Sequence, residues 1–188
     1  MKERIDENTP MKISRLFLFP YLFFSRRLSV GNTSVIDIAC GTALFQRHVL
    51  FMRFDEVILA DSQPVSPEIR KLDITNIDLP DKSVDVAFSF ETIEHTYEHT
   101  KVICELTRIA RKHVVIGSVN IDGPCEIDGL EIYVGERNPY HVKELGIKDF
   151  CELYPNMELF HSTFKDGKFT MSSGLSKKGI CNYGVVNL

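Results

Sequence analysis

The sequence predicts an α/β protein built on one mostly parallel sheet. Apolar runs rich in β-branched residues recur along the 188 residues, and helical stretches separate several of them, which is not the pattern of a sandwich. Helices are expected at about residues 43–52, 97–111 and 145–154. Strands are expected at about residues 33–38, 55–60, 69–73, 83–90, 113–119, 157–164 and 180–187.

Residues 1–30 are expected to form a helical cap over one edge of the core. The apolar run "LFLFPYLFF", Leu16 to Phe24, is too short to span a bilayer, contains Pro20, and has no small-residue cleavage site after it. We therefore expect no transmembrane segment and no signal peptide. Flanking arginines such as Arg26 and Arg27 leave an interfacial membrane anchor as an alternative.

The connections between the predicted strands differ in length. Only "DSQPVSPE" separates the second and third strands, and Pro64 and Pro67 argue against a crossover helix there. We therefore expect that crossover helix to be shortened or missing. Residues 120–145, which follow the fifth strand, are punctuated by Gly, Pro and Asp and are expected to form a long loop at the active site.

Composition favours one domain spanning residues 1–188 and limits the partners. A formal charge of -4 argues against nucleic acid, although basic residues near the N-terminus leave an RNA-contacting arm as an alternative. The five cysteines are odd in number and include no CxxC pair, so neither a disulfide framework nor a zinc knuckle is indicated. We expect a reducing, cytoplasmic location. The sequence does not indicate an oligomeric state.

The stretch "VIDIACGTALF", residues 35–45, reads as a buried strand followed by a tight turn of small residues. A dinucleotide fingerprint needs GxGxxG, but this turn offers Ala39, Gly41 and Leu44 at the three positions. Asp37 would also repel an approaching pyrophosphate. An acidic residue before such a turn suits a nucleoside that carries an amino group or a sulfonium.

These residues resemble motif I of the class I S-adenosylmethionine-dependent methyltransferases, in the type-11-like branch that acts on small molecules. The resemblance extends through "VILAD", "KLDITNIDLPDKSVDVAFSFETIEH" and "NPYHVKEL", covering roughly residues 35–150. It implies a Rossmann-like sheet of seven strands in the order 3-2-1-4-5-7-6, with helices on both faces and the last strand antiparallel. It also implies S-adenosylmethionine as the cofactor.

The resemblance implies roles for individual residues. Asp61, which lies 24 positions after Asp37, would bind the ribose hydroxyls, Asp73 the adenine amino group, and Phe90 and Glu91 would lie beside the methionine moiety. The full cofactor-binding set that it implies is Asp37, Ala39, Cys40, Gly41, Asp61, Ser62, Leu72, Asp73, Ile74, Phe90 and Glu91.

The turn departs from the family pattern at two glycine positions. Ala39 is expected to be a mild change, whereas Ala43 would be strained if it needs a positive φ. Asp85, in the middle of the fourth strand, is expected to tie down this turn from beneath. Reduced cofactor affinity, or a non-catalytic relative that only binds S-adenosylmethionine or S-adenosylhomocysteine, is the alternative that these departures leave open.

Methyl transfer from a sulfonium is an in-line displacement in which positioning supplies most of the rate. A base is needed only for a hydroxyl or protonated amine acceptor, and His95 and His141 are the catalytic candidates, each of which could instead be structural. Tyr133 and Tyr140 could line the pocket of a small-molecule acceptor. No resident metal is expected.

One rival motif points to a different class of protein. "HTYEH", from His95 to His99 with Glu98 as a base, satisfies the H-x-x-E-H pattern of zinc peptidases. Those enzymes carry both histidines on one face of a long helix. A zinc hydrolase is therefore the remote alternative.

Overall fold

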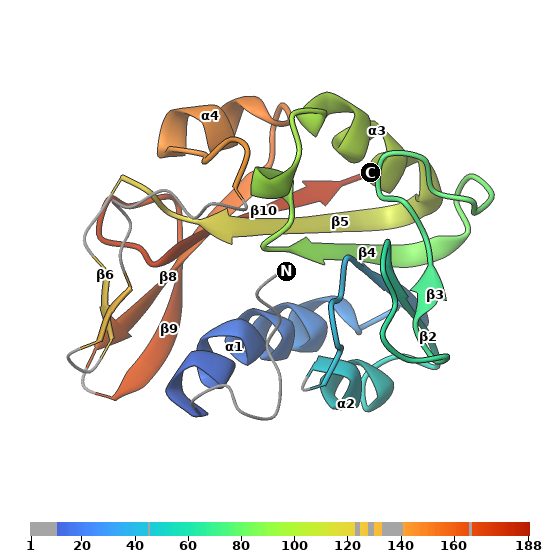
Figure 1. Ribbon diagram of the computed structural model, residues 1–188, viewed down its shortest axis with the longest axis horizontal. Helices are drawn as coiled ribbons and strands as arrows, with labels where there is room; N and C mark the ends of the chain where they lie inside the picture. The colour runs from blue at the N-terminus through green and yellow to red at the C-terminus, as the bar shows by residue number, and fades with distance from the viewer. Residues whose placement is uncertain (1–10, 45, 123–124, 128–129, 133–140, 166) are drawn as a thin grey trace.

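The computed structural model describes residues 11–44, 46–122, 125–127, 130–132, 141–165 and 167–188. Its central sheet has eight strands in the order β3-β2-β1-β4-β5-β10-β8-β9 (Figure 1). The strands are β1 (Ser34–Ile38), β2 (Glu56–Asp61), β3 (Arg70–Lys71), β4 (Val84–Phe90), β5 (Ala110–Val119), β8 (Glu158–Lys165), β9 (Lys168–Ser173) and β10 (Cys181–Asn187). A separate hairpin pairs β6 (Cys125–Ile127) with β7 (Leu130–Ile132).

The predicted order of seven strands is confirmed within this sheet. β3, β2, β1, β4 and β5 are parallel neighbours, and β10 lies antiparallel between β5 and β8. The eighth strand, β9, pairs antiparallel with β8 at the edge and was not predicted. Its sequence "KFTMSS" is short and mostly polar, so its alternation alone gives a weak strand signal.

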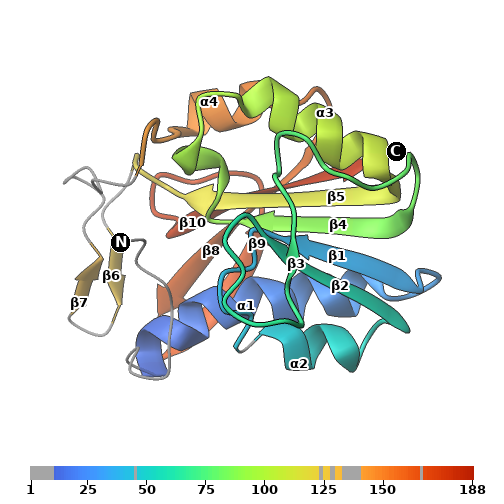
Figure 2. The same cartoon turned by 45° about the vertical axis from the view of Figure 1, so that its right-hand side comes forward.

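Helices cover both faces of the sheet, as expected. In Figures 1 and 2, α1 (Met11–Leu28) and α2 (Gln46–Phe51) lie on one face, and α3 (His99–Ile109) and α4 (Ile147–Glu152) lie on the other. A single turn of 3-10 helix, η1 (Ile93–His95), follows β4. α2, α3 and α4 are all shorter than the sequence predicted.

The connection between β2 and β3 has no helix, which confirms the prediction from its two prolines. β3 is correspondingly short, pairing with β2 only at Ala60 and Asp61. The carboxyl end of β2 is therefore open on that side, because no helix packs over residues 62–69.

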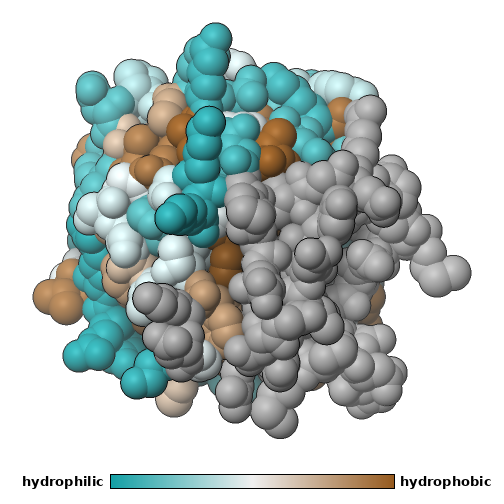
Figure 3. All heavy atoms as spheres, turned by 90° about the vertical axis from the view of Figure 1, so that its left-hand side faces the viewer, coloured by the Kyte–Doolittle hydropathy of each residue, from teal (hydrophilic) through white to brown (hydrophobic). Residues whose placement is uncertain are grey.

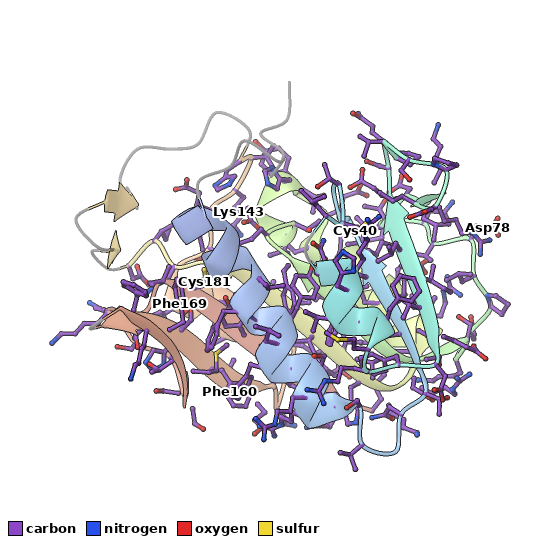
Figure 4. All side chains as sticks on the ribbon, turned by 90° about the horizontal axis from the view of Figure 1, so that it is seen from below. Cys40, Asp78, Lys143, Phe160, Phe169 and Cys181 are labelled. Atoms are coloured by element: carbon purple, nitrogen blue, oxygen red, sulfur yellow. The ribbon has the colours of Figure 1, made fainter. Side chains whose placement is uncertain are left out.

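α1 closes the core on its face of the sheet. Phe24 is fully buried and packs against the rings of Phe90, Phe160 and Tyr183. Seen from below in Figure 4, α1 runs beside α2 across the sheet. This helix continues through Pro20 without a break, and residues 1–10 of the predicted cap lie outside the described residues.

The position of β1 is fixed at its start by a buried carboxylate. Asp85 in β4 accepts hydrogen bonds from the backbone N–H groups of Thr33 (2.8 Å) and Ser34 (3.3 Å) and from Arg111 Nε (2.8 Å). These contacts lie at the amino end of β1, so the expectation that Asp85 supports the turn after β1 is wrong. It aligns three strand starts at the opposite edge of the sheet.

On the face shown in Figure 3, the described residues form a mixed surface of hydrophilic and hydrophobic patches. None of the helices in the described part of the chain is long and apolar enough to cross a membrane.

Candidate active site

The turn after β1 has an unusual backbone. Ala39, Gly41 and Ala43 have φ angles of 63°, 61° and 51°, in the left-handed region that glycine tolerates best. Both alanines therefore sit where the family pattern has glycine and where a Cβ is strained. Ala39 was expected to be a mild change, but its backbone needs a positive φ as much as that of Ala43.

Side chains from neighbouring elements hold this turn in place. Asp61, at the end of β2, accepts a hydrogen bond from the backbone N–H of Gly41 to Oδ2 (3.0 Å) and from that of Gln63 to Oδ1 (2.8 Å). Gln46, at the start of α2, donates to the Cys40 carbonyl (2.9 Å). The turn is thus pinned from β2 on one side and from α2 on the other.

Asp37 lies below the turn and is fully buried. Its carboxylate accepts hydrogen bonds from the Tyr21 hydroxyl of α1 (2.9 Å) and from Gln46 Nε2 (3.4 Å). Burial raises the pKa of Asp37 to about 7. The structure therefore places this residue among internal partners.

A hollow of about 190 Å³ opens at the carboxyl ends of β1 and β2, which is where open α/β sheets bind ligands. Six residues predicted to form the site line it: Ala39, Ser62, Leu72, Asp73, Ile74 and His95. Ile38, Thr75, Thr92 and Thr96 also line it and were not predicted. All four adjoin predicted residues in the sequence, which is the one signal that pointed to them.

One wall of the hollow is the loop after β3. Leu72 is buried there, and Asp73 is exposed. Asp73 Oδ1 accepts hydrogen bonds from the Thr75 N–H and hydroxyl (both 2.8 Å), and these bonds lower the pKa of Asp73. Among the residues described, both bonds go to Oδ1, which leaves Oδ2 for a ligand.

The carboxyl end of β4 carries a second group of polar residues. Phe90 is buried, and Glu91 has a φ of 51° with its N–H bonded to the Gly117 carbonyl (2.9 Å). Glu94 in η1 is only 1% exposed. Burial raises the pKa values of both glutamates above their usual range.

The structure brings His95 and His141 together although they are 46 positions apart in the sequence. Their rings lie edge to face with centroids 4.8 Å apart, and His141 Nδ1 lies 3.3 Å from Glu144 Oε1. The segment that carries His141 is held against η1 because the N–H groups of Val142 and Lys143 donate to the Glu94 carbonyl (2.9 and 3.2 Å). Tyr133 and Tyr140, considered for the acceptor pocket, lie outside the described residues.

The structure does not place His95 and His99 as a zinc peptidase requires. His95 ends η1 and His99 begins α3, and Thr96 between them has an extended backbone (φ −135°, ψ 150°). The two histidines therefore do not share one helix face, and the geometry that this alternative requires is missing.

The strand order is that of the Rossmann-like methyltransferase fold, and the hollow lies at the carboxyl ends of its strands. Residues 36–116 match the family model described as a methyltransferase domain. Together with the similar proteins described below, this match supports a class I S-adenosylmethionine-dependent methyltransferase.

Similar sequences carry related names. A protein of Mycobacterium tuberculosis named a probable S-adenosylmethionine-dependent methyltransferase is 27% identical over 128 residues, which are 63% of this chain and 46% of that protein. One from Mycolicibacterium smegmatis is 28% identical over 132 residues, 65% of this chain and 50% of that protein. The chain spans about half the length of the curated relatives it matches.

Solved structures show the same fold. An S-adenosylmethionine-dependent methyltransferase from Thermotoga maritima has a TM-score of 0.64 at 15% identity, with 93% of each chain covered. One from Aquifex aeolicus has a TM-score of 0.58 at 18% identity and covers 93% of this chain and 92% of its own. At these identities the likeness concerns the fold alone.

The strain at Ala39 is open to test by substitution. Ala39→Gly should leave the free energy of unfolding unchanged or raise it by up to about 1 kcal/mol, because glycine adopts a positive φ without cost. Ala87→Gly, in buried β4, should lower it by about 1–2 kcal/mol through the lost methyl group and added chain entropy. Urea denaturation measures both. An equal loss of unfolding free energy in both variants would show that Ala39 is not strained.

Asp37 should make stability depend on pH. Its folded pKa of about 7 lies above the unfolded value of about 3.9, so its contribution is fully present below about pH 4 and is lost as the pH rises through 7. The difference in unfolding free energy between the natural protein and Asp37→Asn should shift across this window by up to about 1.4 kcal/mol per pH unit. Urea denaturation at several pH values measures it, and a constant difference would contradict the raised pKa.

Proposed function

We propose that the chain binds S-adenosylmethionine in the hollow beside Asp73 and transfers its methyl group to a small-molecule acceptor. The observation that carries this proposal is the meeting of four elements at one edge of the sheet. The turn after β1, the end of β2, the loop after β3 and η1 all contribute to the lining.

The chemistry of the lining supports a nucleoside. Leu72 and Ile74 offer apolar contacts for a purine ring, and Asp73 Oδ2 can accept a hydrogen bond from an exocyclic amino group. The hollow is smaller than the roughly 300–1,000 Å³ of whole ligand sites, so it fits the adenosine half of the cofactor. Asp61 lies behind Gly41, where one oxygen of its carboxylate could also meet the ribose hydroxyls.

The methionine half would extend along the turn towards the carboxyl end of β4. In our proposal, the backbone of Ala39 and Gly41 contacts the methionine half, and Phe90 and Glu91 lie at its far end. Asp37 and Cys40 would then support the turn and not contact the cofactor, because the side chains of both are buried. A sulfonium is favoured here because its positive charge would stabilise the ionised forms of Asp37, Asp61 and Glu91.

Methyl transfer needs little help beyond position. The acceptor atom forms a bond to the methyl carbon as the carbon–sulfur bond breaks, and S-adenosylhomocysteine leaves as a neutral thioether. A hydroxyl or ammonium acceptor must also lose a proton. We place this step on the side of His95 and His141, where either imidazole could accept it.

Cofactor binding gives the direct test. Asp73→Ala should weaken binding of S-adenosylhomocysteine by about 1–3 kcal/mol, because the adenine amino group loses its acceptor. Asp55→Ala, at an exposed aspartate before β2, should leave the dissociation constant unchanged. Isothermal titration calorimetry measures both. If the natural protein binds neither S-adenosylmethionine nor its demethylated product, the proposed function is wrong.

His141→Ala tests the acceptor side of the site separately from cofactor binding. The rate of methyl transfer to an acceptor should fall by about tenfold or more. The affinity for S-adenosylhomocysteine should change little, because His141 does not line the hollow. His48→Ala, on the exposed side of α2, is the matched control. Equal turnover in His141→Ala and the natural protein would remove His141 from the mechanism.

A non-catalytic binder is the second candidate, and one observation favours it. Ala39 and Ala43 hold positive φ angles at positions where the family pattern has glycine, so each Cβ adds strain that glycine would avoid, which is a departure expected of a relative that no longer turns over. Transfer of a labelled methyl group from S-adenosylmethionine to any acceptor would exclude this candidate.

A further inference from the structure

We propose that Glu94, His95 and His141 form a binding site for one divalent transition-metal ion next to the hollow. One ligand atom from each residue lies within 4.8 Å of the other two. Two imidazole nitrogens and one carboxylate oxygen are the ligands of catalytic zinc sites that keep a further position open. This set differs from the H-x-x-E-H motif, of which it uses only His95.

The carboxylate of Glu94 is the strongest reason to expect a cation. The residue is 1% exposed, and neither carboxylate oxygen has a hydrogen-bond partner of good geometry among the residues described, although the side chains of Glu91 and Ser118 lie beside it. A buried carboxylate without a partner loses its hydration and gains nothing in return. Glu91 and Glu144 add negative charge near it. A metal ion in contact with Glu94 would supply the missing partner.

The backbone and a nearby carboxylate preorganise the three ligands. Glu94 and His95 are adjacent in η1, and the Glu94 carbonyl binds the N–H groups of Val142 and Lys143, so His141 is held beside them. His141 Nδ1 lies 3.3 Å from Glu144 Oε1. With the proton on Nδ1, that bond orients the ring and leaves Nε2 for the ion, as in carboxylate–histidine–metal groups.

The donor set and geometry select the class of ion. Metal–ligand distances of about 2.0–2.2 Å bring ligand atoms to roughly 3–3.5 Å from one another, so ligand atoms that now lie up to 4.8 Å apart must close by about 1–2 Å on binding. Imidazole nitrogens favour zinc and its first-row neighbours over magnesium or calcium, which prefer oxygen ligands alone. His141 is 12% exposed, so an ion has a path from solvent.

The ion would lie where the acceptor is proposed to approach, because His95 belongs both to the ligand set and to the lining of the hollow. With the ion bound, the two imidazoles are ligands and cannot also accept a proton. An ion with an open position lowers the pKa of a bound hydroxyl or water, so an acceptor hydroxyl bound to it would lose its proton to water without an imidazole base.

Metal titration of the full chain tests this site without any assay of activity. Tag-free, chelator-treated protein is titrated with Zn²⁺ by calorimetry, and with Co²⁺ by visible absorption as a second probe. We expect one ion per chain in the natural protein. His141→Ala and Glu94→Gln, which preserves the side-chain shape, should each weaken binding by at least about tenfold, whereas His48→Ala should not. Circular dichroism confirms that each variant is folded.

Two results would overturn the site: no binding of either ion to the natural protein, or the same affinity in the natural protein, Glu94→Gln and His141→Ala. Titration of the same samples with S-adenosylhomocysteine separates this inference from the proposed function. If the protein binds S-adenosylhomocysteine but no metal, only the metal-site inference is wrong. If it binds the metal but not S-adenosylhomocysteine, the metal site is supported and the proposed cofactor is wrong.

Discussion

The backbone of the turn after β1 is the constraint on which the site depends. Ala39, Gly41 and Ala43 all have positive φ, and this brings the chain back sharply enough for its N–H groups to face neighbouring side chains. Asp61 uses one such group, the N–H of Gly41, so the end of β2 and the turn hold each other. The fully buried Asp37 lies beneath, between α1 and α2. Rearranging the turn would expose or orphan these carboxylates, each at a cost in free energy.

The sequence was sufficient for most of the sheet because its strong signals are local. Four of the five parallel strands, β1, β2, β4 and β5, contain apolar runs, and Pro64 and Pro67 exclude the crossover helix after β2. β9 was missed because a short, mostly polar edge strand depends on its partner β8 more than on its own residues. Asp85 was placed at the wrong end of β1, since periodicity gives the face of a strand residue but not the partners it reaches.

The site shows the same division. Residues carried by the family motifs, such as Leu72, Asp73 and Ile74, line the hollow. The resemblance did not distinguish lining residues from supporting ones, and the structure buries Asp37 and Cys40, which the resemblance assigns to the cofactor. The grouping of Glu94 with His95 and His141 depends on the long segment after β5 folding back on η1. No spacing in the sequence predicts that contact.

The central claim is that the hollow beside Asp73 is the adenosine site, and a crystal structure of the complex with S-adenosylhomocysteine tests it most directly. The account predicts the adenine between Leu72 and Ile74 with its amino group on Asp73, and the sulfur directed towards η1. A nucleoside bound at another place on the sheet, with the hollow left free, would contradict it.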